Sequence, residues 1–139
     1  MKKLFALLLF VGSTTIALAQ QKADDIIGTY MTPENKAMVE VTKKDNKYYG
    51  KFLWTKTEGK LDMNNPVATE KTKPLKGMEF LKGFSFDNKS TWNNGTIYDP
   101  ENGKTYSCKI TADEKGNLSV RGFIGVSLLG RTSVFIKVK

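Results

Sequence analysis

The sequence contains no histidine and a single cysteine, Cys108, among its 139 residues. Without an imidazole the chain cannot form a Ser-His-Asp or Cys-His catalytic group, a histidine metal ligand or a c-type haem site. One cysteine likewise excludes an intramolecular disulfide, a CxxC redox pair and a zinc cluster built on thiolates. The composition therefore removes several common catalytic and metal-binding classes.

The chain also lacks an apolar run long enough to cross a membrane as a helix. Its apolar stretch near the N-terminus is about ten residues long, whereas a spanning helix needs about twenty. That stretch, from Leu4 to Val11, follows Lys2 and Lys3 and precedes Ala17-Leu18-Ala19. A charged start, an apolar centre and a small-residue end are typical of a secretory signal peptide.

We therefore expect residues 1–19 to be a signal peptide that is cleaved after Ala19, and residues 20–139 to form a single domain. The mature protein would then be periplasmic or secreted. The apolar rows of its segments are only three or four residues long, too short for the outward apolar band of a membrane barrel. We do not expect the mature chain to span a membrane.

Arginine is scarce although the chain is basic. Residues 20–139 hold 20 Lys and Arg against 14 Asp and Glu, a net charge of +6, and only Arg121 and Arg131 are arginine. Nucleic-acid surfaces favour arginine for bidentate contacts, so we expect no nucleic-acid partner. The scattered lysines indicate a solubilising surface that protects strand edges, or one with weak attraction to anionic lipid or an anionic glycan.

Short segments with alternating polarity are separated by turn residues about every ten positions. Clusters such as 43–46, 99–103 and 113–117 combine Asn, Asp, Gly and Pro in the manner of tight turns. Helical patterns are almost absent. The alternation predicts about eight strands, near residues 27–32, 37–43, 47–56, 78–86, 94–99, 104–111, 118–124 and 131–138. This pattern favours an all-β, antiparallel, up-and-down barrel of about eight strands.

The alternation also predicts which side chains face inward. The expected inward rows are Tyr48, Gly50, Phe52 and Trp54; Tyr106, Cys108 and Ile110; Leu118 and Val120; and Val134, Ile136 and Val138. Closure into a barrel is favoured because the last segment ends one residue before the C-terminus, where an unpaired edge would promote aggregation. The connection from Thr57 to Gly77 is too irregular for a hairpin, and we expect it to form a lid or plug.

Several motifs recur, in the same order, in exported bacterial proteins. They are Gly28-Thr29-Tyr30-Met31-Thr32, Tyr49-Gly50-Lys51, Asp62-Met63-Asn64-Asn65-Pro66, Pro74-Leu75-Lys76-Gly77, Gly95-Thr96-Ile97-Tyr98-Asp99-Pro100, Gly103-Lys104-Thr105-Tyr106, Leu118-Ser119-Val120-Arg121-Gly122 and Gly130-Arg131-Thr132. With them the chain resembles the bacterial domain-of-unknown-function family numbered 2147. The resemblance implies an exported, calycin-like (lipocalin-like) β-barrel of undetermined activity.

The resemblance also implies a structural plug. Lipocalin-like barrels often place an aromatic ring of the first strand beneath an arginine from the end of the barrel. In this sequence Tyr30 and Arg131 occupy the matching positions. A cation over an aromatic ring contributes about 0.5–2 kcal/mol, depending on burial.

Four polar residues in turns are candidates for catalysis or metal binding. Asp62, with Asn64 and Asn65, starts like an EF-hand loop, but Lys73 stands where the bidentate glutamate belongs. An Asx turn that ends at Pro66 explains these residues better. Asp99 opens another turn, and nothing in its spacing from Asp62 indicates a paired-carboxylate glycosidase. We expect no enzyme activity, no metal site and no cofactor.

The aromatic side chains leave two functions open. Trp54, Trp92, Tyr98 and Tyr106 either fill the barrel or line a ligand cavity, and Arg121 would bind a ligand carboxylate if its side chain faced inward. The first function is a binding module for a small apolar or amphipathic ligand. The alternative is a structural or interaction protein of the cell envelope with a packed barrel and an exposed apolar patch.

Overall fold

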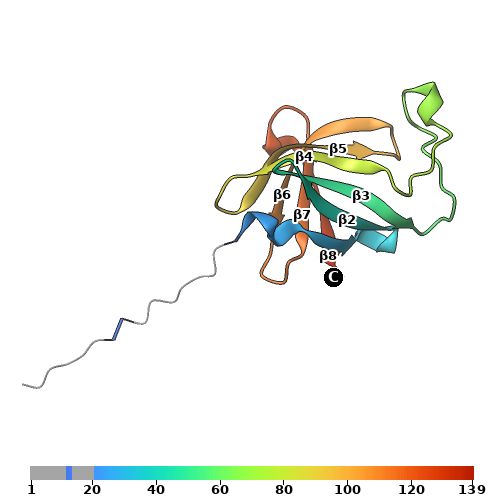
Figure 1. Ribbon diagram of the computed structural model, residues 1–139. Helices are drawn as coiled ribbons and strands as arrows, with labels where there is room; N and C mark the ends of the chain where they lie inside the picture. The colour runs from blue at the N-terminus through green and yellow to red at the C-terminus, as the bar shows by residue number, and fades with distance from the viewer. Residues whose placement is uncertain (1–11, 14–20) are drawn as a thin grey trace, which may run out of the picture.

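The computed structural model describes residues 12–13 and 21–139 and shows a closed β-barrel (Figure 1). The predicted signal peptide, with its cleavage point after Ala19, lies outside the described residues except for positions 12 and 13. The strands are β1 (Gly28–Met31), β2 (Ala37–Lys44), β3 (Lys47–Thr55), β4 (Glu79–Phe86), β5 (Thr91–Asp99), β6 (Lys104–Ala112), β7 (Leu118–Phe123) and β8 (Arg131–Lys137).

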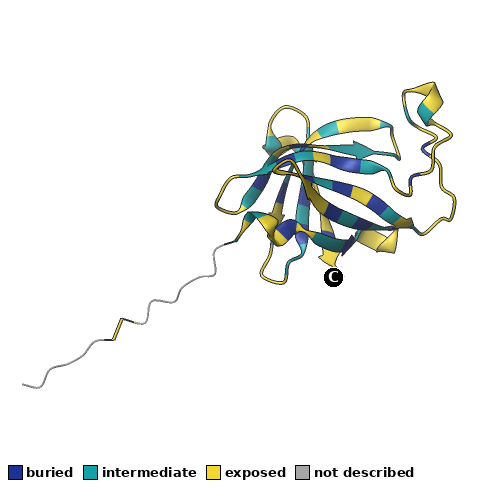
Figure 2. Cartoon of the chain, viewed as in Figure 1, coloured by how far each residue is buried: buried dark blue, intermediate teal, exposed yellow. Residues whose placement is uncertain are grey.

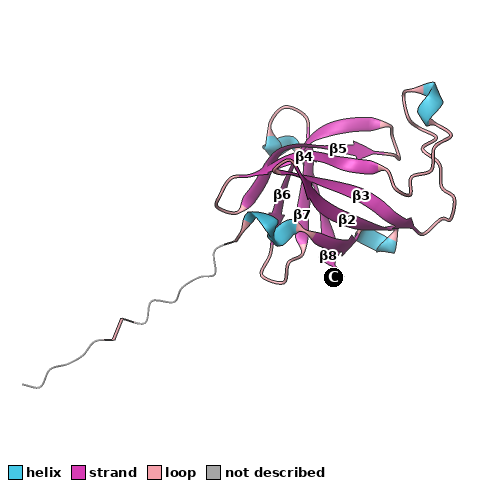
Figure 3. Cartoon of the chain, viewed as in Figure 1, coloured by secondary structure: helices cyan, strands magenta, loops and turns pink. Residues whose placement is uncertain are grey.

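Each strand pairs antiparallel with the next, and β8 pairs with β1 to close the ring. The predicted eight-stranded up-and-down barrel is confirmed. The described residues also form short 3₁₀ helices, drawn cyan in Figure 3. One, η1 (Ala23–Ile26), precedes β1, and three lie in the connections: η2 (Pro33–Asn35), η3 (Ala68–Glu70) and η4 (Ser127–Leu129).

Up-and-down topology gives the barrel two different ends. The end that carries η1, the turns 45–46, 87–90 and 113–117 and the last residue, Lys139, is called the closed end below. The other end carries the connections after β1, β3, β5 and β7 and is called the rim.

The barrel interior is filled by large side chains. Trp92, Tyr30, Tyr48 and Phe84 are the largest of the fully buried side chains. Every strand contributes at least one buried residue, and buried residues are dark blue in Figure 2. Gly95 shows how tightly the space is used, because a Cβ atom there would overlap the ring of Phe84. An eight-stranded barrel is just wide enough for its own side chains to fill, and this one uses that space.

Two of the predicted inward rows need correction. Val134, Ile136 and Val138 face outward and are about half exposed, whereas Phe135 is buried. The reason is the register between β7 and β8, in which Phe135 lies opposite the buried Leu118. The row of β3 holds for Tyr48, Gly50 and Phe52 but not for Trp54.

The closed end is sealed by η1, which three aromatic side chains hold. The Tyr30 hydroxyl donates to the carbonyl of Ile26 (2.7 Å), and the Trp92 indole donates to the carbonyl of Ala23 (2.9 Å). The Tyr48 hydroxyl donates to the Asp24 carboxylate (2.5 Å), and this bond, together with Lys43, lowers the pKa of Asp24. Because Tyr30, Tyr48 and Trp92 come from β1, β3 and β5, the plug ties three strands together.

The prediction that Arg131 packs on Tyr30 is wrong. Tyr30 is fully buried at the closed end, and its partner on β8 is Lys137. The Lys137 ammonium lies 6.0 Å from the centre of the Tyr30 ring. Arg131 begins β8 at the rim, six residues away along the strand, and its side chain is exposed. The cation over this ring is therefore a lysine from the opposite end of β8.

The 57–77 connection is a two-armed excursion rather than a structureless loop. A β-bridge joins Leu61 to Pro74, η3 lies between the two arms, and the segment projects beyond β3 and β4 in Figure 1. Leu75 is its contribution to the buried hydrophobic core. The expected lid or plug is thus limited to this one side chain.

Asp62 fixes the excursion against β5. Its carboxyl group is buried and accepts hydrogen bonds from the Tyr98 hydroxyl (2.6 Å) and the Asn65 amide (2.7 Å). Burial, together with the bond to Asp62, raises the pKa of Tyr98 to about 12, so its hydroxyl remains a donor at neutral pH. The Asn64 amide adds bonds to the carbonyls of Pro100 and Glu101.

The turn interpretation of Asp99 is confirmed, since its carboxylate accepts the N–H of Glu101 (2.9 Å). In the other turn, the side chain that accepts a backbone N–H is that of Asn65, which accepts from Val67 (2.9 Å). Asp62 instead reaches across to Tyr98. Both carboxylates therefore serve to hold connections at the rim.

We predict that Trp92→Phe lowers the free energy of unfolding by about 2 kcal/mol, because it removes the hydrogen bond to the partly buried carbonyl of Ala23 and opens space in the core. The matched control is Trp54→Phe, whose ring is 43% exposed; we expect a change below about 0.5 kcal/mol there. Urea denaturation measures both. Equal losses in the two variants would contradict the role assigned to the plug.

We predict that Tyr98→Phe frees the 57–77 connection by removing one of the two side-chain donors to the buried Asp62, at a cost of about 1–3 kcal/mol. Hydrogen exchange should increase at residues 60–75 more than in the strands. Tyr106→Phe is the control, because the Tyr106 hydroxyl only accepts a bond from the exposed Asn102 amide (2.8 Å). Unchanged exchange in Tyr98→Phe would refute this anchor.

Candidate functional site

The barrel core itself offers no polar group that awaits a partner. Within residues 21–139, no buried side-chain nitrogen or oxygen lacks a hydrogen bond. Buried polar groups left without a protein partner are the usual mark of an interior binding site for a polar ligand. A candidate site must therefore be sought where side chains remain open to solvent.

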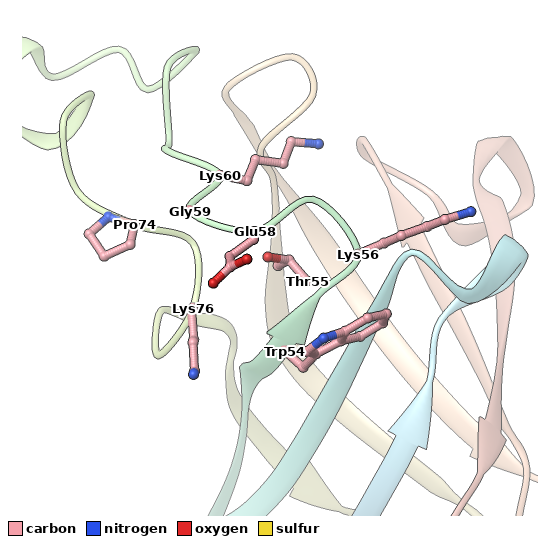
Figure 4. A pocket seen from close by; sticks show the side chains of 8 residues that line it. All are labelled: Trp54, Thr55, Lys56, Glu58, Gly59, Lys60, Pro74 and Lys76. Carbon is pink, nitrogen blue, oxygen red and sulfur yellow. The ribbon is translucent and has the colours of Figure 1, made fainter.

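A pocket of about 540 Å³ lies at the rim, between the end of β3 and the 57–77 connection (Figure 4). None of its lining residues belongs to the buried core. The lining consists of Trp54, Thr55, Lys56, Glu58, Gly59, Lys60, Pro74 and Lys76. We call it the Trp54 pocket.

A β-bulge places Trp54 in this pocket. Val39 pairs with Phe52 but Met38 pairs with Trp54, so Leu53 is an extra residue in β3. An inserted residue bends a strand and reverses the inside-outside alternation beyond it. Phe52 consequently points into the core, where it stacks on Phe80 with ring centroids 4.0 Å apart, and Trp54 stands 43% exposed.

The polar part of the Trp54 pocket is predominantly cationic. It contains Lys56, Lys60 and Lys76 against a single carboxylate, Glu58. None of these four side chains forms an ion pair within the described part of the chain. In Figure 4 the Glu58 carboxylate points between Thr55 and Lys76, while the Lys56 side chain extends away from it. The pocket therefore has an aromatic wall and an excess of two uncompensated positive charges.

The connection that forms one wall is held in place from outside the pocket. The N–H of Leu75 donates to the carbonyl of Lys60 (2.8 Å), and that of Gly77 to the carbonyl of Phe52 (2.6 Å). The Asp62–Tyr98 bond fixes the same segment to β5. The lining thus has a defined shape although its side chains are exposed.

The other predicted ligand residues are not gathered around this pocket. Trp92 is buried against η1, and Tyr106 bonds Asn102 at the β5–β6 turn. Tyr98 lines a smaller pocket of about 250 Å³, together with Asn65, Glu79 and Lys82. The prediction of one interior site that combines all five residues is not supported by these positions.

Arg121 lies on the outer face of β7, so its side chain does not face the barrel interior. Its neighbours Val120 and Gly122 share the opposite face with Leu118. The guanidinium group is occupied by the loop after β7, with bonds to the carbonyls of Ser127 (2.6 Å) and Leu128 (3.3 Å). Arg121 does not point into the barrel and does not bind a ligand there.

Sequence reasoning identified Trp54 but missed the lysines that surround it. Lys56, Lys60 and Lys76 looked like part of a scattered solubilising surface, because no pattern linked residues 56–60 to residue 76. The bridge between Leu61 and Pro74 brings them together. The available signal was local: an alternation of Lys56, Glu58 and Lys60 directly after an aromatic strand end.

No helix among the described residues is long and apolar enough to cross a membrane.

The fold is shared with a solved bacterial protein. The chain is similar to HP1028 from the human pathogen Helicobacter pylori, described as belonging to the lipocalin family, with a TM-score of 0.76. The two are 22% identical over 82% of this chain and 83% of that one, and at this identity the likeness shows the fold alone. Comparison with curated protein sequences finds no match.

The family described as "Uncharacterized protein conserved in bacteria (DUF2147)" matches residues 28–137. This range runs from the start of β1 to the end of β8 and so covers the whole barrel. It confirms the resemblance that the Tyr-Asp-Pro turn and its flanking motifs indicated. The chain belongs to the bacterial DUF2147 family.

Proposed function

We propose that the protein binds one small amphipathic anion in the Trp54 pocket. The observation that carries this proposal is the half-exposed Trp54 ring beside three lysines that have no ion-pair partner among the described residues. The ring would contact the apolar part of the ligand, and the ammonium groups would orient its anionic group.

The size and composition of the pocket support this ligand class. Sites for small molecules typically measure about 300–1,000 Å³ and combine apolar walls with a few polar groups. The Trp54 pocket, at about 540 Å³, lies in that range. Tryptophan offers a large apolar contact area with one polar atom, which suits a ligand that is itself part apolar.

The rim is a better location than the interior. Eight-stranded barrels of the lipocalin kind hold a small ligand inside when the inward side chains leave space for it. Here Trp92, Tyr48 and Phe84 occupy that space, and η1 seals the closed end. Binding at the rim keeps the ligand near the barrel opening without displacing the core.

We propose binding without chemical conversion. The pocket has one carboxylate, Glu58, and no second titratable acid for general acid–base work beside it. We also propose that the protein acts outside the cytoplasm. The support for this location is the order of residues 2–19, with two lysines, an apolar run and an Ala-Leu-Ala ending.

We predict that Lys60→Gln with Lys76→Gln weakens the binding of dodecanoate about tenfold, because two favourable charge interactions of modest size are lost. Isothermal titration calorimetry measures the affinity. The control is Lys89→Gln with Lys115→Gln, which removes the same charge from the turns 87–90 and 113–117 at the closed end. Decanol, which is neutral, should not distinguish the two double variants.

Two outcomes would overturn the ligand proposal. One is equal weakening of dodecanoate binding in both double variants, which would mean that only net charge matters. The other is the absence of dodecanoate binding by the unchanged protein at millimolar concentration.

We predict that protein purified from its own cell envelope has the mass of a chain that begins at Gln20. Native mass spectrometry measures this mass and, in the same spectrum, any bound small molecule. A mass that includes residues 1–19 would contradict export by a cleaved leader. A bare protein mass with the leader removed would count against the ligand alone.

A further inference from the structure

The loop between β7 and β8 exposes an unusual amount of apolar surface. Residues 124–130, called the 124–130 loop below, present Ile124, Val126, Leu128 and Leu129 with exposed fractions of 72, 58, 87 and 79%. Ser127 is its only polar side chain. Figure 2 shows this part of the rim in the colour of exposed residues. Contiguous apolar surface of this kind usually marks a contact with a partner or a membrane.

The loop is held in a defined shape. Arg121 binds the carbonyls of Ser127 and Leu128 and also donates to the Thr132 hydroxyl (2.8 Å). The N–H of Leu129 donates to the carbonyl of Val126 (3.1 Å), within the turn that contains η4. With the carbonyls tied to the guanidinium group, the side chains of Leu128 and Leu129 remain on the outside. Their exposure is therefore built into the local structure.

The strands on either side of the loop place basic side chains next to it. Lys109 on β6 and Arg121 on β7 bond to the loop or lie beside it, and Arg131 begins β8 directly after it. Residues 104–112 and 118–139 contain no Asp or Glu; the two acids between them, Asp113 and Glu114, lie in the turn at the closed end. The Lys109 ammonium reaches the Ser127 hydroxyl at 3.4 Å, which places a cation directly beside the apolar side chains.

We propose that the 124–130 loop docks the rim onto the surface of a bilayer that contains anionic lipids. Aliphatic side chains would enter the boundary between headgroups and acyl chains, and the flanking cations would meet the lipid phosphates. Peripheral membrane attachment uses this combination of apolar insertion and electrostatic attraction. The proposal does not depend on the Trp54 pocket.

The charge and composition of this surface favour a bilayer over other partners. A second copy that used the same face would bring two cationic surfaces together, which is unfavourable. Protein interfaces concentrate their binding energy in tryptophan, tyrosine and arginine. The exposed large side chains of this loop are only Ile, Val and Leu, and Arg121 is engaged inside the chain. In Figure 1 the loop, in orange-red at the top of the view, protrudes from the barrel as an inserting element would.

The test is flotation of the chain from Gln20 onward with lipid vesicles, since the barrel and its plug lie within residues 21–139. We expect this protein to bind vesicles of equal parts phosphatidylglycerol and phosphatidylethanolamine, and to bind phosphatidylcholine vesicles at least tenfold more weakly. Leu128→Ser with Leu129→Ser should reduce binding to the anionic vesicles at least tenfold. Salt at 0.5 M should weaken binding by the unchanged chain, as screening requires.

The control variant is Met63→Ser with Val67→Ser, which removes two exposed apolar side chains from the 57–77 connection, 70 and 53% exposed. It should bind anionic vesicles like the unchanged protein. Circular dichroism establishes that each variant retains its strands. Equal binding by the Leu128/Leu129 variant and the unchanged protein would overturn the proposal.

A photo-crosslinker at position 128, activated in intact cell envelopes, separates the remaining occupants. Adducts with lipid support the proposal. Adducts only with another protein, or a dimer that disappears in the Leu128/Leu129 variant while anionic vesicles are not bound, would overturn it in favour of a protein partner or a second copy.

Discussion

Closure of the sheet by β1 is the constraint on which the rest of the molecule depends. This strand has four residues, yet it pairs with β2 on one side and with β8 on the other. Further bonds join Thr29 to Val138 (2.8 Å) and Lys139 (2.9 Å). Once eight strands form a ring, the interior has a fixed size, and aromatic side chains occupy it. The filled interior therefore leaves the connections at the two ends as the surfaces on which a ligand or partner is proposed to bind.

Because the interior is filled, the side chains at the two ends of the barrel have different roles. At the closed end, Tyr30, Tyr48 and Trp92 donate hydrogen bonds to η1. These aromatic side chains could have contacted a ligand, but here they stabilise the barrel. At the rim, the bulge at Leu53 and the Asp62–Tyr98 bond shape a cationic pocket, and Arg121 shapes an apolar loop. In each case a buried or half-buried polar contact determines what a neighbouring exposed surface presents.

Alternating polarity was enough to locate the strands, because every second side chain of a half-buried strand faces the core. Turns rich in Asn, Asp, Gly and Pro separate one strand from the next. It was not enough to predict which face of β8 points inward. Three apolar residues of β8 and the residue after it lie on the outer face and only Phe135 on the inner face, and the pairing of Phe135 with Leu118 fixes this orientation. Trp54 was predicted as a candidate ligand residue. The β-bulge at Leu53, which turns Trp54 outward, could not be predicted from the sequence pattern. The hydrogen bond between Asp62 and Tyr98 joins residues 36 positions apart, and no local pattern indicates it. The cation beside Tyr30 likewise could not be predicted without knowing which end of β8 pairs with β1. The apolar run from Phe123 to Leu129 is visible in the sequence, whereas its exposure follows from the Arg121 contacts.

Residues 21 and 139 both lie near the closed end of the barrel. Gln21 bonds the carbonyl of Ala112 near the closed end, and Lys139 bonds Thr29 there as well. A tag or surface tether attached at residue 21 or at residue 139 would leave the opposite side of the barrel facing solution. Immobilised at either position, the barrel would present its rim to whatever is passed over it.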